Sequence, residues 1–212
     1  MSGSMTPVSV FLVIPPLSQL NTPYPSTAYL TGFLRSRGVA CHQADLGIEM
    51  VLRLFSRDGV QAIFDEVRAF EDPLPNEACA MLEASQAYTR WIDSVIAFLQ
   101  GRTPYGAAEL ARQDVLPQGP RFAGRARFPR SMSVLDRAKL RATWFLEDLA
   151  DLVQAVVSPH FALNRYAEHL ARSASSFETL EAGLAEKPNL TDRFMLDALS
   201  AHLERLRPHL VG

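Results

Sequence analysis

The sequence is poor in cysteine and contains no long hydrophobic run. Its two cysteines, Cys41 and Cys79, stand in no C-x-x-C or Cys/His spacing, so they predict reduced, mostly buried thiols rather than a disulfide framework. No segment reaches the roughly 18–20 consecutive apolar residues that cross a membrane. The apolar run 8–14 is too short and lacks the basic flank of a signal peptide. These absences favour a cytoplasmic protein without a membrane partner.

Lysine is scarce too, and neither sign of charge dominates. The 21 basic residues include only two lysines, Lys139 and Lys187, and face 23 acidic residues, which gives a formal net charge of −2. This balance offers no electrostatic reason to expect nucleic acid as a partner. Hydrophobic residues make up 48% of the chain, which is enough for a core and argues against intrinsic disorder.

The common catalytic and cofactor motifs are missing. No G-x-G-x-x-G follows the first apolar run, and no G-x-x-x-x-G-K-[ST] occurs, so neither phosphate-binding fingerprint is present. The five histidines form no zinc signature, and no metal site is predicted. Glu147, Asp148 and Asp151 gather on one predicted helix, where we interpret them as a solvated face rather than a carboxylate site.

The N-terminal part has a β-α-β pattern. The β-branched run 8–14 predicts a strand buried on both faces, and residues 39–44 predict a second strand parallel to it. Between them lies a helix that we expect Ser26 or Thr27 to cap and Gly38 to end. Residues 5–47 therefore predict the start of a Rossmann-like parallel sheet. Residues 1–4, MSGS, resemble a cloning remnant and are set aside.

Residues 48–207 are predicted to form a large helical insertion. Helical spacing predicts helices over 48–70, 77–99, 133–157, 161–172, 176–185 and 191–207, with a short piece at 105–113. Helix 133–157 carries the strongest apolar stripe, and Thr191 is expected to cap the last helix. Residues 208–212 resemble the opening of a third strand, at which the sequence looks cut. The predicted fold class is a helix-dominated α/β protein.

Polar and proline residues gather where ligands bind in a parallel sheet. Such sheets bind ligands beyond the carboxyl ends of their strands, and the loop after the first strand lies there. The candidate cofactor-binding residues are Pro15, Pro16, Asn21, Thr22, Tyr24, Ser26, Thr27 and Asp45. Prolines lower the entropy cost of holding one loop shape. A rigid loop that only packs over the sheet edge, or docks a neighbouring domain, is an equal alternative.

Three stretches of the chain resemble one family. IPPLSQLNTPYPSTAYLTGFLRSRG, together with HQADLGIEMVLRLFSRDG, is similar to the N-terminal region of cobalamin-binding-domain radical S-adenosylmethionine proteins. FLEDLADLVQAVVSPHFALNRYAEHLA resembles the next stretch of one such subgroup, and HLERLRPHLVG resembles its entry into a third Rossmann strand. The likeness covers most of residues 8–212, and the long proline-rich loop is its most specific feature.

The resemblance implies motifs and a further domain that this chain does not contain. Family members carry a C-x-x-x-C-x-x-C motif for a [4Fe–4S] cluster in a downstream barrel, whereas the two cysteines here are 38 positions apart. The cluster, S-adenosylmethionine and the radical reaction are therefore expected only in a missing downstream domain. The cobalt-ligating D-x-H-x-x-G motif is absent too, because Asp45 in DLGIE has no histidine two positions on. Cobalamin in the full-length parent would lack a histidine ligand.

Two functions remain open at this point. The chain is either a cobalamin-binding-like module of a radical enzyme, not catalytic by itself, or a non-catalytic helical interaction or dimerisation domain that binds no cofactor. The first needs polar groups that converge beyond the first strand, and the second needs an exposed apolar patch. The expected partners are the remaining domains of the parent protein, or a second copy of the chain. This region of the sequence does not indicate the substrate of the parent enzyme.

Overall fold

The described residues of the computed structural model form two compact units. The structure describes residues 8–16, 25–103, 106–123, 128–129, 131–159, 161–163, 177–178, 181 and 185–212. The sheet unit takes its described residues from Met1–Val51, Leu163–Pro188 and Asp192–Gly212. The helical unit takes its own from Leu52–Ala162 and Asn189–Thr191. Packing therefore groups the last helix with the sheet, although the chain reaches it only after the helical stretch.

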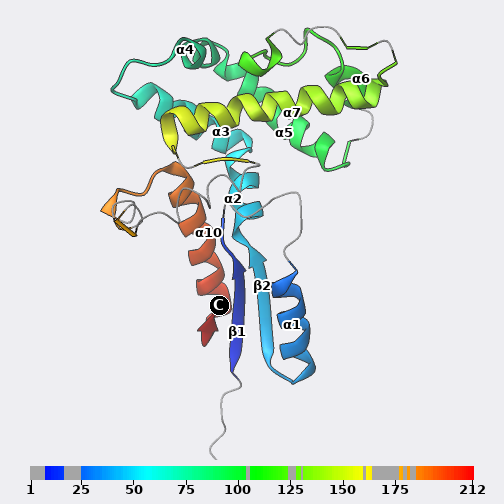
Figure 1. The fold of residues 1–212 in the computed structure, drawn as a ribbon. Helices are drawn as coiled ribbons and strands as arrows, with labels where there is room; N and C mark the ends of the chain where they lie inside the picture. The colour runs from blue at the N-terminus through cyan, green and yellow to red at the C-terminus, as the bar shows by residue number, and fades with distance from the viewer. Residues whose placement is uncertain are drawn as a thin grey trace, which may run out of the picture. The chain divides into compact units, whose positions relative to one another are not determined.

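Helices dominate the order of elements, as the sequence predicted (Figure 1). In chain order they are β1 Ser9–Ile14, α1 Ser26–Ser36, β2 Ala40–Asp45, α2 Leu46–Leu54, α3 Arg57–Ala69, α4 Asn76–Glu83, α5 Ser85–Leu99, α6 Ala107–Leu110, η2 Pro120–Phe122, α7 Val134–Leu152, η3 Val153–Val157, α10 Leu190–Leu206 and β3 Leu210–Val211. The expected helices 161–172 and 176–185 fall almost wholly outside the described residues. No helix of the described part is long and apolar enough to span a bilayer.

The three described strands form one parallel sheet with the order β2-β1-β3. The register pairs Ser9 with Ala40 and Ile14 with Asp45, and it pairs Val10 with Leu210 on the other side. The predicted β-α-β pattern and its parallel pairing are confirmed. A short third strand follows where the HLVG segment indicated one.

Helices cover both faces of this sheet. Val10 and Cys41 are register partners, so they share one face and Phe11 points to the other. On the first face Cys41 Sγ lies 3.7 Å from Thr31 Oγ1 of α1. On the second, the rings of Phe11 and His202 of α10 lie 5.2 Å apart. Strand β1 is therefore the buried centre of the unit, which explains its unbroken apolar sequence.

His202 also ties α10 to α2. Arg205 Nη2 donates to His202 Nδ1 at 2.8 Å, and His202 Nε2 lies 2.9 Å from both carboxylate oxygens of Glu49. Because a guanidinium can only donate, Nδ1 is the acceptor and Nε2 carries the proton toward Glu49. This pairing holds α10 over the sheet and positions the strand that follows it.

The C-terminal end of α1 was predicted correctly, whereas its N-terminal cap was not. Gly38 has a φ of +77°, and the amides of Gly38 and Val39 bond to the carbonyls of Arg35 and Leu34, both at 3.0 Å. This is a Schellman ending, which favours glycine. At the other end Pro25 is the cap residue and no side chain caps the helix. The expectation that Ser26 or Thr27 would cap it was wrong, because the helix begins at Ser26.

Two long predicted helices are each broken in two. Residues 48–70 divide into α2 and α3 because the Ser56 side chain accepts a hydrogen bond from Gly59 N at 3.1 Å and begins a new helix. Residues 77–99 likewise divide into α4 and α5 at Ala84. The expected cap Thr191 lies inside α10, and Asn189 Oδ1 accepts from its amide at 2.9 Å instead.

The core of the helical unit is aromatic. Tyr88 stacks on Phe145 with ring centroids 5.0 Å apart and packs against Phe64 at 5.9 Å. The apolar stripe of α7 faces this core, since Phe145 and Leu149 are 0% exposed. Of the two cysteines only Cys41 is buried, and Cys79 is exposed, contrary to the expectation for that thiol.

Candidate functional site

The structure brings part of the predicted site to the carboxyl edge of the sheet. Pro15 and Pro16 directly follow β1, and Asp45 ends β2 opposite Ile14. Gly47 lies against this turn, because a Cβ there would stand 3.5 Å from Pro16 Cα and 3.6 Å from the Pro15 carbonyl oxygen. The two prolines therefore pack against the start of α2 and form one wall of the edge.

Asp45 has a structural task at this edge. Its Oδ1 accepts a hydrogen bond from Ile48 N at 3.0 Å, so the carboxylate caps α2. Its side chain is half-buried. A negative charge at a helix N-terminus is also favoured by the helix dipole. One oxygen of Asp45 is thus engaged by the protein as a helix cap.

The first turn of α1 offers hydrogen-bond donors to a ligand and no acidic side chain. Ser26 and Thr27 occupy the first turn, which has no side-chain cap and no acidic residue. The first amides of a helix have no partner inside it, so they can donate to a polar ligand. The predicted residues Asn21, Thr22 and Tyr24 lie outside the described residues. The described edge therefore consists of Pro15, Pro16, Ser26, Thr27 and Asp45.

A second polar cluster lies in the helical unit, around Asp148. This carboxylate is 0% exposed, so its predicted place on a solvated face was wrong. It accepts hydrogen bonds from Gly119 N at 3.0 Å and Arg121 N at 2.7 Å. Burial raises the pKa of Asp148 to about 6, although the two amide bonds and Arg121 act in the opposite direction. The neighbouring Asp151 charge adds to the rise.

Asp148 fixes the loop that precedes η2. A Cβ on Gly119 would stand 2.5 Å from the Asp148 carboxyl carbon, so only glycine fits there. Arg121 extends from the same loop to Asp151, with Nε and Nη2 donating to its two oxygens at 2.5 and 2.8 Å. One loop of about four residues is thus held by two carboxylates of α7.

Arg141 is a buried cation of the same helix, 3% exposed. Its guanidinium donates to the carbonyls of Leu110 and Gln113, both at 3.1 Å, and lies 5.2 Å from the Phe122 ring centroid. Burial lowers the pKa of Arg141, and the Asp114 charge partly offsets the effect. Because its partners are backbone carbonyls and a ring, we assign this residue a structural role.

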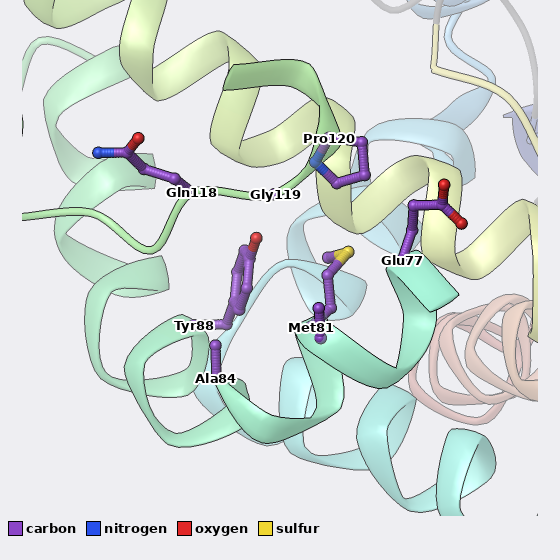
Figure 2. Close-up of a pocket in the computed structure, with 8 residues that line it drawn as sticks. Glu77, Met81, Ala84, Tyr88, Gln118, Gly119 and Pro120 are labelled. Carbon is purple, nitrogen blue, oxygen red and sulfur yellow. The ribbon is translucent and has the colours of Figure 1, made fainter. Parts of the chain in front are cut away.

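A pocket of about 180 Å³ opens beside the Asp148 loop (Figure 2). It lies between α4, the start of α5 and the loop, and it is lined by Glu77, Ala80, Met81, Ala84, Tyr88, Gln118, Gly119 and Pro120. Burial, followed by the Asp148 charge and a side-chain hydrogen bond with Asp148, raises the pKa of Tyr88 well above its ordinary range. The phenol is therefore protonated at neutral pH.

Sequence reasoning missed this pocket, although one signal was available. Asp148 lies three residues after Phe145 and four before Leu152, and both of these are buried. That spacing places Asp148 on the apolar stripe of the helix, not on its solvated side. The contacts of the Gly119 loop with α7 come from residues about 30 positions away, and helical periodicity cannot reveal them.

Comparison with known proteins adds no assignment. No family model, no curated protein and no solved structure matches this chain. Within the described part, no group of three or more His, Cys, Asp or Glu side chains is placed to hold a metal ion. Any function must therefore be inferred from the residues and geometry of the two sites themselves.

Proposed function

We propose that this chain is a cytoplasmic, cobalamin-binding-like module of a radical S-adenosylmethionine enzyme, and that its ligand lies at the carboxyl edge of the sheet. The observation that carries the proposal is the strand order β2-β1-β3 with parallel pairing throughout. The chain moves from β1 to β2 on one side and later returns to β3 on the other. In sheets of this kind the ligand binds where the order reverses, beyond the strand ends.

The residues at the reversal point suit a large, uncharged cofactor. Pro15 and Pro16 stand at the end of β1, and the uncapped first turn of α1 offers amide donors at Ser26 and Thr27. The side chains of a corrin ring end in amides, whose oxygens can accept such bonds. No histidine belongs to the described edge, so a bound cobalamin would take no histidine ligand from the residues described there. When bound, cobalamin would supply a cobalt centre for group transfer.

The iron–sulfur cluster and S-adenosylmethionine belong, in this proposal, to a separate domain of the parent enzyme. The chain has two cysteines, 38 positions apart, and one cluster of the family type needs three in a close motif. Cys41 is moreover buried beneath α1. The proposed role of the module is to hold the cofactor and not to generate the radical.

Titration with aquocobalamin tests the proposal. We expect saturable binding by equilibrium dialysis, with a visible spectrum that shows no exchange of cobalt-bound water for imidazole. Thr27→Arg, at the start of α1, should weaken binding at least tenfold by blocking the edge. Ser36→Arg adds the same side chain at the opposite end of α1 and serves as the matched control. A folded chain that binds no cobalamin, or equal effects of the two variants, would contradict the proposal.

A second candidate function is an interaction domain, and the outer face of α1 favours it. Tyr29, Leu30 and Phe33 are 78%, 50% and 56% exposed, and they lie together at helical spacing. An exposed apolar group of this kind marks a contact surface more often than an isolated residue does. A second copy of the chain is the simplest partner, because a two-fold dimer pairs one patch with itself. The mass of the chain across a concentration series tests this candidate.

A further inference from the structure

The C-terminal strand β3 is joined to β1 partly through a histidine side chain. His209 N donates to the Ser9 carbonyl at 2.9 Å, and in return the Ser9 amide donates to His209 Nδ1 at 3.2 Å. The Ser9 hydroxyl lies 2.9 Å from the same ring nitrogen. Further along, Gly212 N donates to the Phe11 carbonyl at 3.0 Å, and Val13 N donates to the Gly212 carbonyl at 2.7 Å. The imidazole therefore takes the place of a backbone carbonyl at the start of the β1–β3 pairing.

These contacts define the protonation state of the His209 ring. A backbone amide can only donate, so Nδ1 accepts from Ser9 and the ring proton is on Nε2. A protonated imidazole has a donor on both nitrogens. The Ser9 hydroxyl can turn and accept from Nδ1–H, but the Ser9 amide loses its acceptor and faces a second N–H. Binding of a proton and binding of the Ser9 amide therefore exclude each other at Nδ1.

The surroundings of His209 do not hold a charged ring against β1. Strand β1 contains no ionisable side chain, and within the described residues no carboxylate forms an ion pair with His209. The ionisable residues in the five positions before it are Glu204, Arg205 and Arg207, of which two are cations. Because His209 is exposed, a charged ring can turn away from Ser9 into water, where it is better solvated.

The backbone between α10 and β3 is strained, which favours release of the strand. Arg207 has a φ of +43°, in the left-handed region that a side chain disfavours. Its amide donates to the Leu203 carbonyl at 2.8 Å, and Pro208 follows it. A proline favours an extended conformation in the residue before it. The bonds between β3 and β1 therefore hold a corner that relaxes when they break.

The other histidine of this segment responds differently to a proton. His202 Nδ1 also accepts, from Arg205 Nη2 at 2.8 Å, but its Nε2 lies 2.9 Å from both carboxylate oxygens of Glu49. A protonated His202 loses the Arg205 bond and gains an ion pair with Glu49. Helix α10 therefore stays attached to α2 in acid, and the change is confined to the corner and to β3.

We propose that His209 is a proton-sensitive latch, whose neutral imidazole holds β3 against β1 and whose protonation releases the strand. Histidine is the side chain that ordinarily changes charge between pH 5 and 8. Release leaves backbone groups of β1 unpaired, and such an edge can pair with another strand. The latch needs no bound ligand, so it stands or falls independently of cobalamin binding.

Amide hydrogen exchange of the full chain, followed by nuclear magnetic resonance, tests the latch. The Val13 amide reports the attachment of β3, because it is bonded to Gly212. The adjacent Leu12 amide points to β2, since successive amides of a strand alternate in direction. Between about pH 7.5 and about pH 5.5 the protection factor of Val13 should fall roughly 3–10-fold relative to that of Leu12, which corresponds to the loss of about one hydrogen bond.

Two matched variants separate His209 from the other histidines. His209→Asn keeps an acceptor oxygen near the position of Nδ1 and does not titrate, so the fall in Val13 protection should disappear. His42→Asn makes the same substitution at an exposed histidine of β2 and should keep the fall. His202→Asn should keep it too, because the proposal assigns the response to His209 alone.

The nitrogen-15 spectrum of the imidazoles gives a test that needs no variant. At about pH 7.5 the His209 ring should carry its proton on Nε2, and protonation of Nδ1 should follow the same pH dependence as the loss of Val13 protection. The proposal is overturned if Nδ1 already carries the proton at about pH 7.5, or if only the Ser9 amide responds to acid while Val13 keeps its protection. It is also overturned if His209→Asn retains the original fall.

Discussion

At the scale of single residues, the ionisation of Asp148 has a thermodynamic consequence. Burial raises its pKa from the ordinary 3.8 to about 6 in the folded chain. The folded protein therefore keeps a proton at this site over a pH range in which the unfolded chain has lost it. The stabilisation from that proton is complete below about pH 4 and disappears as the pH rises through 6.

We therefore predict that part of the pH dependence of stability originates at Asp148. Between pH 4 and 6 the free energy of unfolding of the original chain should fall, relative to Asp148→Asn, by as much as about 3 kcal/mol. Asparagine keeps one acceptor oxygen for the Gly119 loop but does not titrate. Urea unfolding of both proteins at several pH values measures the difference. Parallel stability curves would show that Asp148 has an ordinary pKa.

The same residue shows where prediction from sequence reaches its limit. The apolar run of β1, the Gly38 stop and the stripe of α7 are local patterns, and each was predicted from its own stretch of sequence. The burial of Asp148 depends on a loop from another part of the chain, held by the amides of Gly119 and Arg121. An acidic residue in a helix is exposed far more often than not, so composition alone favoured the wrong interpretation.

At the scale of elements, two glycines have opposite roles in α1 and just beyond its C-terminal end. Gly32 lies inside the helix, is exposed, and would have no atom within 4 Å of an added Cβ. Gly38 ends the helix with a φ of +77°, a conformation that a side chain disfavours. One glycine therefore weakens the helix without a visible packing reason, and the other is needed to end it.

We predict that Gly32→Ala stabilises the chain by roughly 0.5–1 kcal/mol, because alanine loses less conformational entropy in a helix. Gly38→Ala should destabilise it by roughly 1–2 kcal/mol, since it forces a side chain into the left-handed region. Chemical denaturation monitored by circular dichroism compares the two. A loss of stability in Gly32→Ala would show that this position is constrained in a way the helix geometry does not explain.

Boundaries between elements were harder to predict than the elements themselves. Apolar spacing continues across Phe55 and Ser56, so periodicity merged α2 with α3, and only the Ser56 cap separates them. Prediction of the candidate site likewise succeeded for some features and failed for others. The sequence placed Pro15 and Asp45 at one edge correctly, because parallel strands end on the same side. It could not show that Asp45 already caps α2, since that bond depends on how the chain turns after β2.

At the scale of the whole molecule, burial decides which apolar helix face could pair two copies of the chain. The strongest apolar stripe, on α7, cannot pair two copies, because Phe145, Leu149 and Leu152 are at most 3% exposed and pack within the chain. The outer face of α1 is exposed, with Tyr29 and Phe33 its most exposed large hydrophobic residues. Self-association through the helical stripe would require the unit to open, whereas association through α1 requires no rearrangement.

We predict that the chain forms a two-fold dimer through α1 at high concentration. Phe33→Glu should abolish this dimer by placing a charge in the contact, and Arg37 four residues later can pair with the new carboxylate and preserve the helix. Leu196→Glu replaces an apolar residue of comparable exposure, 43%, on α10 and should leave the dimer intact. Light scattering across a concentration series reports the mass of each protein. If the original chain keeps a monomeric mass at the highest concentration, or if Leu196→Glu disrupts association as strongly as Phe33→Glu, the α1 face is not a self-association surface.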